Sequence, residues 1–143
     1  MCSNINQTQI QVRYSETDQM AVAYHGNYFA WFEIGRTELM REAGLPYGEL
    51  EDNGLFLPVL KAYCEYKSSV LYDDVVTVIT RTEKLSGTRI KFTYEIIRDH
   101  KVLAEGYTEH AFLQKGGKPV ILYKHNSLLW ERLSAVIGPD EKR

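Results

Sequence analysis

The chain has 143 residues, of which 44% are hydrophobic and 25% are charged, and its formal net charge is −2. This length and balance predict one globular domain over residues 1–143. The slight negative charge argues against a general nucleic-acid binder, no apolar run reaches the roughly 18 residues of a membrane span, and residues 1–11 lack a signal-peptide core. The two cysteines, Cys2 and Cys64, make neither a disulfide framework nor a zinc site, so we expect a cytoplasmic protein without metal or cofactor.

The first half of the chain predicts a strand followed by a long helix. Apolar and polar side chains alternate over 8–14, which is typical of a strand, and a polar loop over 15–26 follows. From Tyr28 onward, apolar residues recur with helical spacing until Gly44 and Pro46 end the helix, and Asn27 is placed to cap it. Because the first turns of this helix are apolar on most sides, we expect it to be buried rather than laid on a surface. A second, short helical turn is predicted over 47–53.

The second half predicts consecutive strands and a final helix. Strand patterns cover 60–67, 75–85, 89–96 and 102–114, with turns at Ser86-Gly87, Asp99-His100 and Gly116-Gly117. Short turns between consecutive strands imply an antiparallel sheet, and one apolar helix needs that sheet to cover it. The sequence therefore predicts an α+β fold with its core at about 8–114 and a C-terminal helix at about 127–137, capped by Asn126 and stopped by Gly138.

Three segments resemble a known enzyme family. The run Arg13-Tyr14-Ser15-Glu16-Thr17-Asp18, the run Val22-Ala23-Tyr24-His25-Gly26-Asn27-Tyr28 and the later Tyr72-Asp73-Asp74-Val75 are similar to segments of the hotdog-fold acyl-CoA thioesterases. The nearest branches are the 4-hydroxybenzoyl-CoA thioesterase family and its YbgC-like members. The resemblance implies a hotdog fold, in which an antiparallel sheet wraps around a long central helix. It also implies hydrolysis of an acyl-CoA to a carboxylic acid and CoA without a cofactor.

The resemblance also implies which residues are catalytic. Asp18 matches an aspartate that either attacks the thioester carbonyl or activates a water, and the sequence leaves both routes open. His25 matches the residue whose backbone N–H polarises that carbonyl, which suits a helix start with its unpaired N–H groups and positive dipole end. Gly26 would let the substrate approach the backbone. The His25 imidazole could hold Asp18, touch the acyl group or fill a subunit seam.

Further residues are weaker candidates. Tyr24, Gly26, Asn27 and Tyr28 are expected to contact substrate, although both tyrosines also suit packing. Glu33 is a second candidate acid that could instead pair with Arg36 or Arg41 on the helix surface.

Basic residues at strand ends and turns could meet CoA phosphates, although an ordinary charged surface explains each of them alone: Lys67, Arg89, Lys91, Lys115 and Lys118. His110 is explained by core packing and Cys64 by burial as a small apolar residue. No two histidines have metal-ligand spacing.

Two other functions and an assembly state stay open at this stage. The chain could be a non-catalytic module that binds acyl-CoA or an acyl carrier, or a hotdog dehydratase or hydratase, although it lacks a Pro-His-rich substrate loop. A short sheet curled round one helix leaves open strand edges that must be covered. The resemblance implies that two sheets join edge to edge, with substrate between subunits, in a homo-oligomer that is a dimer or a tetramer of dimers.

Overall fold

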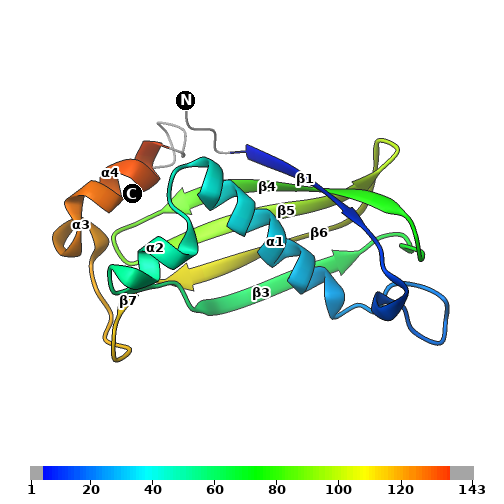
Figure 1. Ribbon diagram of the computed structural model, residues 1–143, viewed down its shortest axis with the longest axis horizontal. Coiled ribbons are helices and arrows are strands. Elements are labelled where there is room, and N and C mark those ends of the chain that lie inside the picture. The colour runs from blue at the N-terminus through cyan, green and yellow to red at the C-terminus, as the bar shows by residue number, and fades with distance from the viewer. Residues whose placement is uncertain (1–4, 136–143) are drawn as a thin grey trace.

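The computed structural model describes residues 5–135, and Figure 1 shows one long helix crossing a face of an antiparallel sheet. Five strands form this sheet in the order β1-β4-β5-β6-β3. Their bounds are Ile5–Gln11 (β1), Val59–Tyr66 (β3), Val75–Leu85 (β4), Arg89–Arg98 (β5) and Lys101–Ala111 (β6). All neighbouring strands pair antiparallel, so the predicted α+β class is confirmed.

The long helix α1 (Asn27–Glu42) packs against the sheet through a single apolar face. The buried residues of this face are Tyr28, Trp31, Phe32, Gly35, Leu39 and Met40. Gly35 allows the close approach, because a Cβ at this position would lie 2.2 Å from Thr80 Oγ1 on β4. The sequence suggested a helix buried on most sides, but Ala30, Glu33 and Ile34 are exposed. The sheet of one chain covers only one side of α1.

Several element boundaries differ from the sequence pattern. The first strand runs Ile5–Gln11 rather than over 8–14, and Tyr14 begins a short 3-10 helix, η1 (Tyr14–Glu16). The predicted strand over 102–114 is divided at Phe112, which separates β6 from β7 (Leu113–Gln114). This division follows from the pairing: β6 ends at Ala111, the partner of the first β5 residue Arg89, and β7 then pairs with β2 (Leu55–Phe56) instead.

Three short helices complete the described chain. α2 (Tyr47–Asp52) confirms the predicted turn after α1, whereas α3 (Leu122–His125) was not predicted. Asn126 caps α4 (Ser127–Ala135) as expected, because its Oδ1 accepts the Leu129 N–H at 3.1 Å. The expected end of this helix at 137 and its stop at Gly138 lie outside the described residues. Apolar side chains of α3 and α4 pack into the same core cluster as α1 and the sheet.

Strand β3 forms one edge of the sheet and pairs only with β6 (Figure 1). Along its whole length the side chains are exposed, apart from half-buried Cys64. Cys64, expected to be a small buried apolar residue, is only partly buried in the single chain and packs against the core cluster. Four large hydrophobic residues of this strand are among those exposed: Val59, Leu60, Tyr63 and Tyr66.

A chain of buried hydrogen bonds links α1 to the sheet and ends at His110. The partner atom in Leu57 is its carbonyl oxygen, which can only accept, so His110 Nδ1 donates to it at 3.0 Å. In the neutral ring Nε2 is then the acceptor, and the Thr108 hydroxyl donates to it at 2.8 Å. Thr108 must then accept from the Tyr94 hydroxyl at 2.6 Å, and Arg36 donates to Tyr94 at 3.5 Å. Burial lowers the pKa of His110 to about 4. His110 is therefore a neutral core residue, as the sequence suggested.

Within residues 5–135, no helix is long and apolar enough to cross a membrane. The same described part of the chain contains no group of three or more metal-ligating side chains.

The low pKa of His110 predicts a specific loss of stability in acid. In the unfolded chain His110 has its ordinary pKa of 6.5, whereas in the folded protein its pKa is about 4. The ring therefore stays neutral in the folded protein until the pH approaches 4. The free energy of unfolding should therefore fall as pH drops from 6.5 to 4, by roughly 3 kcal/mol for this one group. Denaturant titrations of wild type and His110→Gln across this range measure the effect. The exposed His125→Gln is the control substitution, and equal pH slopes for wild type and His110→Gln would contradict the prediction.

Candidate functional site

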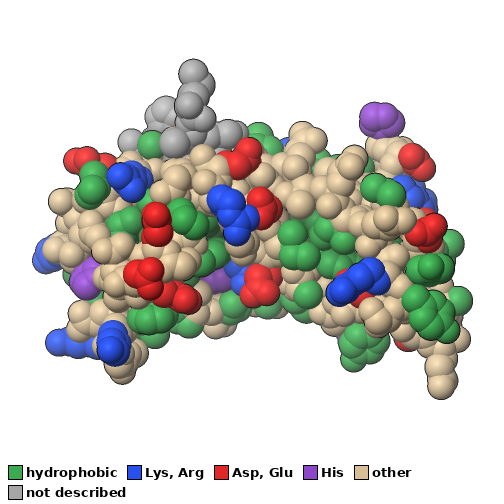
Figure 2. All heavy atoms as spheres, viewed as in Figure 1, with side chains coloured by type: hydrophobic (Ala, Val, Ile, Leu, Met, Phe, Trp, Pro, Cys, Tyr) green, Lys and Arg blue, Asp and Glu red, His purple; other side chains and the backbone are tan. Residues whose placement is uncertain are grey.

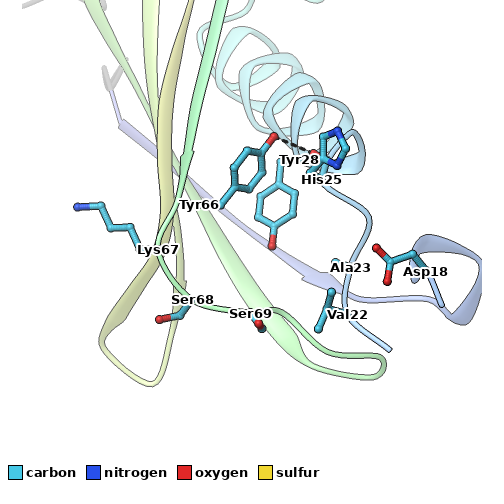
Figure 3. A pocket seen from close by; sticks show the side chains of 9 residues that line it. All are labelled: Asp18, Val22, Ala23, His25, Tyr28, Tyr66, Lys67, Ser68 and Ser69. Carbon is cyan, nitrogen blue, oxygen red and sulfur yellow. Dashed lines mark hydrogen bonds between the residues drawn. The ribbon is translucent and has the colours of Figure 1, made fainter. Parts of the chain in front are cut away.

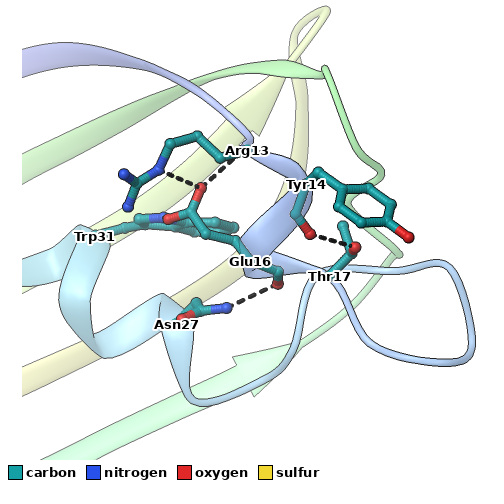
Figure 4. A network of polar contacts seen from close by, with 6 residues as sticks. All are labelled: Arg13, Tyr14, Glu16, Thr17, Asn27 and Trp31. Atoms are coloured by element: carbon teal, nitrogen blue, oxygen red, sulfur yellow. Dashed lines mark hydrogen bonds and ion pairs between the residues drawn. The ribbon is translucent and has the colours of Figure 1, made fainter.

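The loop that precedes α1 is attached to the helix through Glu16 (Figure 4). Glu16 Oε2 accepts the Trp31 indole N–H at 2.9 Å, and Oε1 accepts the Arg13 backbone N–H at 2.8 Å. The Glu16 carbonyl accepts the Asn27 side-chain amide at 2.7 Å and the Tyr24 N–H at 2.8 Å. One residue in η1 thus fixes both ends of the loop and the first turns of α1.

The sequence predicted Asn27 as the cap of the helix, but Asn27 does not take this role. It is the first residue of α1, and Gly26 occupies the N-cap position without a side-chain cap. The Asn27 side chain instead donates to Glu16, as described above. Its amide therefore orients the loop relative to the helix and does not satisfy a helix N–H group.

The peptide groups at the start of α1 have fixed orientations. The Tyr24 carbonyl accepts the Asn27 N–H at 3.0 Å, and the His25 carbonyl accepts the Tyr28 N–H at 3.2 Å. In a planar trans peptide the N–H points away from the carbonyl of the same unit. The N–H groups of His25 and Gly26 therefore point out of the helix start, and neither has a hydrogen-bond acceptor within residues 5–135. They are two donors at the positive end of a 16-residue helix.

Tyr66, at the end of β3, holds one of these peptides through a hydrogen bond of its side chain. Its hydroxyl donates to the His25 carbonyl at 3.0 Å, as Figure 3 shows. Burial, with a smaller effect from Cys64, raises the pKa of Tyr66 to about 12. The phenol therefore keeps its proton, and remains a donor, at any physiological pH.

Asp18 lies in a tight turn of the same loop. Its Oδ1 accepts the Met20 N–H at 2.8 Å, and its backbone N–H donates to the Val22 carbonyl at 2.9 Å. The turn includes Ala21 at φ +65°, a left-handed conformation that costs a non-glycine residue about 1–2 kcal/mol. The second carboxylate oxygen, Oδ2, has no hydrogen-bond partner among the described residues. Asp18 is thus held by one oxygen while the other is available.

A cavity of about 330 Å³ brings part of the predicted site together (Figure 3). Its lining consists of Asp18, Val22, Ala23, His25, Tyr28, Tyr66, Lys67, Ser68 and Ser69. We call it the Asp18–His25 cavity. Four residues singled out from the sequence line it, namely Asp18, His25, Tyr28 and Lys67, whereas Tyr24, Gly26 and Asn27 do not. Gly26 is still close to the neighbouring side chain, since a Cβ there would lie 2.8 Å from the Tyr24 ring.

The His25 imidazole and the Tyr28 ring have different surroundings. The imidazole is exposed, lies 4.5 Å from the Tyr24 ring between centroids, and makes no hydrogen bond or ion pair within residues 5–135, so it does not hold Asp18. Tyr28 is buried, and its ring meets Tyr66 edge to face at 4.8 Å. Burial, with a smaller effect from Cys64, raises the pKa of Tyr28 to about 12.

The other candidate acids and bases lie apart from this cavity or have partners of their own. Glu33 pairs with Arg36 at 3.9 Å and lines a different cavity with Tyr47. Lys67 extends away from the Asp18–His25 cavity in Figure 3 and pairs with Glu105 at 3.1 Å. None of the other four basic candidates, Arg89, Lys91, Lys115 and Lys118, lines this cavity.

No site role was predicted for Tyr66, Ser68, Ser69 or Glu16. Glu16 stood inside the recognised motif, so its position was a usable signal. Tyr66 had no such signal, because it lies forty-one residues after His25 and its contact with His25 depends on the pairing of β3 with β6.

Comparisons with known proteins agree on the family. The profile of the thioesterase-like superfamily matches residues 12–129. A protein of Aquifex aeolicus is 38% identical over 106 residues, which cover 74% of this chain and 83% of the relative. The acyl-CoA thioester hydrolase YbgC of Escherichia coli O157:H7 is 30% identical over 94 residues, which cover 66% of this chain and 70% of YbgC.

A solved structure extends the agreement to the fold. The DHNA-CoA thioesterase from Staphylococcus aureus superposes with a TM-score of 0.88 at 35% identity, covering 92% of this chain and 90% of that one. The sheet order, the central helix and these relatives together confirm the hotdog fold. The chain belongs to the thioesterase-like superfamily and is a YbgC-like thioester hydrolase.

Proposed function

We propose that the protein hydrolyses acyl-CoA thioesters to a carboxylic acid and CoA, with the reacting carbonyl at the start of α1. The main support is that His25, whose N–H has no acceptor within residues 5–135, and Asp18, whose Oδ2 is free there, line the same cavity. Such a cavity offers a donor for a developing oxyanion and a carboxylate for attack or proton removal.

The reaction then needs two actions from these residues. Attack on the carbonyl carbon places negative charge on its oxygen, and the N–H groups of His25 and Gly26 stabilise that charge; one such donor is worth about 10²–10³ in rate. Asp18 either attacks the carbon itself, giving an anhydride that water cleaves, or removes a proton from an attacking water. In both routes the C–S bond breaks, and the CoA thiolate leaves and takes up a proton.

Replacing Asp18 should abolish most of the turnover. Asp18→Asn keeps an oxygen that can accept the Met20 N–H, so the turn should persist while kcat falls by about 10²–10⁴. Release of free thiol from a panel of acyl-CoAs, with a thermal melt of each variant, measures both effects. Asp99→Asn, at a surface turn with φ +51° that asparagine tolerates, is the matched control. A folded Asp18→Asn protein with wild-type kcat would exclude Asp18 and make Glu33 the next acid to test.

Tyr66 should act as a positioning residue for the helix start. Tyr66→Phe removes only the hydroxyl that holds the His25 carbonyl, at a cost near the ~1 kcal/mol of one hydrogen bond. We expect kcat to fall about 5–10-fold with little change in KM, since the fixed peptide matters most in the transition state. Tyr63→Phe, three positions back on the same strand, is the control for loss of a phenol. If both variants have the same kcat, the His25 carbonyl needs no such support.

We also propose that the protein works as a homo-oligomer built from dimers. The described chain leaves β3 as an open strand edge, with Val59, Leu60 and Tyr63 between 45% and 48% exposed. Open hydrophobic edges invite pairing, so soluble proteins cover them. The exposed side of α1 at Ala30 and Ile34 adds a second apolar surface. Tyr66 belongs to the same strand, so pairing at this edge would bring a second copy close to the Asp18–His25 cavity.

A charge placed on β3 should separate the subunits and stop catalysis. In a twofold interface Leu60→Glu would introduce two charges, which require desolvation without partners. Light scattering over a dilution series, run beside thiol release, should show a smaller species with little activity. Leu128→Glu on α4, where the side chain is 57% exposed, is the control for a surface charge. A fully active wild-type monomer would contradict the shared site.

A further inference from the structure

A polar cavity lies between α1, α2 and the segment that joins β2 to β3. It measures about 300 Å³ and is lined by Glu33, Arg36, Thr37, Tyr47, Glu51 and Leu57. We call it the Arg36–Tyr47 cavity, and none of its lining residues lines the Asp18–His25 cavity. Figure 1 places α2 at the end of the molecule opposite the loop of Asp18, and Figure 2 shows acidic side chains gathered over α2.

The guanidinium of Arg36 is buried with few partners. Its side chain is only 11% exposed. Within residues 5–135 it donates to the Tyr94 hydroxyl at 3.5 Å and lies 3.9 Å from Glu33 Oε2, and both distances are long for charge-assisted contacts. A guanidinium is planar and binds a carboxylate best through two parallel hydrogen bonds. No carboxylate of the described residues takes that position on Arg36.

The hydroxyl of Tyr47 is a second donor without an acceptor. Its oxygen is shielded from solvent and has no hydrogen-bond partner among the described residues. Burial raises the pKa of Tyr47, although the neighbouring Arg36 charge opposes the change, so the phenol keeps its proton. A buried donor without an acceptor costs free energy. An oxyanion in the cavity would accept hydrogen bonds from Tyr47 and Arg36 together.

Two carboxylates restrict the kind of ligand that fits. Glu33 and Glu51 line the same cavity, and both are exposed residues of their helices. A ligand with only negative charge would be repelled by both of them, whereas a ligand with only positive charge would lie beside Arg36. A zwitterion avoids both penalties, because its carboxylate can face Arg36 while its ammonium group faces the two glutamates.

An apolar cavity adjoins this polar one. It measures about 450 Å³ and shares Glu51 and Leu57 with the Arg36–Tyr47 cavity. The apolar part of its lining consists of Phe56, Leu57, Pro58 and Leu113. Because Glu51 lines both cavities, a ligand whose ammonium group is held at Glu51 can direct an apolar substituent into the second cavity.

We propose that the two cavities together form a binding site for an α-amino acid with an apolar side chain. Its carboxylate accepts hydrogen bonds from Arg36 and Tyr47, and its ammonium group lies between Glu33 and Glu51. Its side chain occupies the adjoining apolar cavity. This site goes beyond acyl-CoA hydrolysis and does not depend on it.

Calorimetry with a free amino acid and three analogues tests each contact. We expect L-leucine to bind wild type with a millimolar or tighter dissociation constant. The probe 4-methylpentanoate lacks only the ammonium group, 3-methylbutylamine lacks only the carboxylate, and free glycine lacks only the apolar side chain. Each analogue should bind about tenfold more weakly than L-leucine or worse, since each loses one of the three contacts.

Tyr47→Phe is the sharpest variant, because its hydroxyl has no partner within residues 5–135 to lose. Its melting temperature should equal or exceed that of wild type, whereas its affinity for L-leucine should fall about tenfold. Glu51→Gln should weaken the binding of L-leucine and not that of 4-methylpentanoate, since only L-leucine carries the ammonium group. Glu49→Gln, on the same helix and in the lining of neither cavity, is the matched control and should bind L-leucine as wild type does.

The alternatives give different results. If 4-methylpentanoate binds as tightly as L-leucine, the site takes anions, and if 3-methylbutylamine does so, it takes cations; either result would overturn the proposal. Absence of L-leucine binding, which would leave the cavities to water, or an unchanged affinity in Tyr47→Phe would overturn it as well. Thiol release from acyl-CoA by wild type is measured separately, so failure of the proposed hydrolysis would leave this site in place.

Discussion

The bonds accepted by Glu16 are the constraint on which the site depends. With its carboxylate and its carbonyl, this one residue holds Trp31 of the helix, Asn27 at the helix start and the backbone on either side of Asp18. Its side chain is only 12% exposed, so these charge-assisted bonds are little screened by solvent. Because the loop cannot move independently of α1, the free N–H groups and the carboxylate keep a fixed spacing.

This rigidity offsets an unfavourable local backbone. Ala21 lies in the left-handed region, and two polar groups of the helix start have no acceptor within residues 5–135. The left-handed backbone costs free energy that neighbouring structure offsets, whereas the N–H groups, on exposed residues, are left to solvent or a ligand. Tyr66 and the Glu16 network hold the strained segment from opposite sides. Donors that are already oriented need no rearrangement when charge develops on a carbonyl oxygen, which is how strain in the free protein can serve catalysis.

Local patterns in the sequence predicted the antiparallel sheet and two residues of the candidate site. The run rich in β-branched residues over 75–85 predicted β4 with its observed bounds, and the motif around Asp18 and His25 identified two residues that share a cavity. Contacts between distant segments were not predictable in this way. The role of Asn27 depends on Glu16 eleven residues earlier, and the role of Tyr66 depends on how β3 pairs. Burial of α1 was overestimated because its apolar surface exceeds what one sheet can cover.

The central claim is that the helix start polarises the thioester carbonyl. Infrared difference spectroscopy of an acyl-CoA carrying a ¹³C-labelled thioester carbonyl, bound to the Asp18→Asn protein, measures this directly. We expect the carbonyl stretch to move to lower frequency than in free acyl-CoA, and part of this shift to be lost when Tyr66→Phe is added. A bound carbonyl with the frequency of the free thioester would show that the N–H groups of His25 and Gly26 do not contact it.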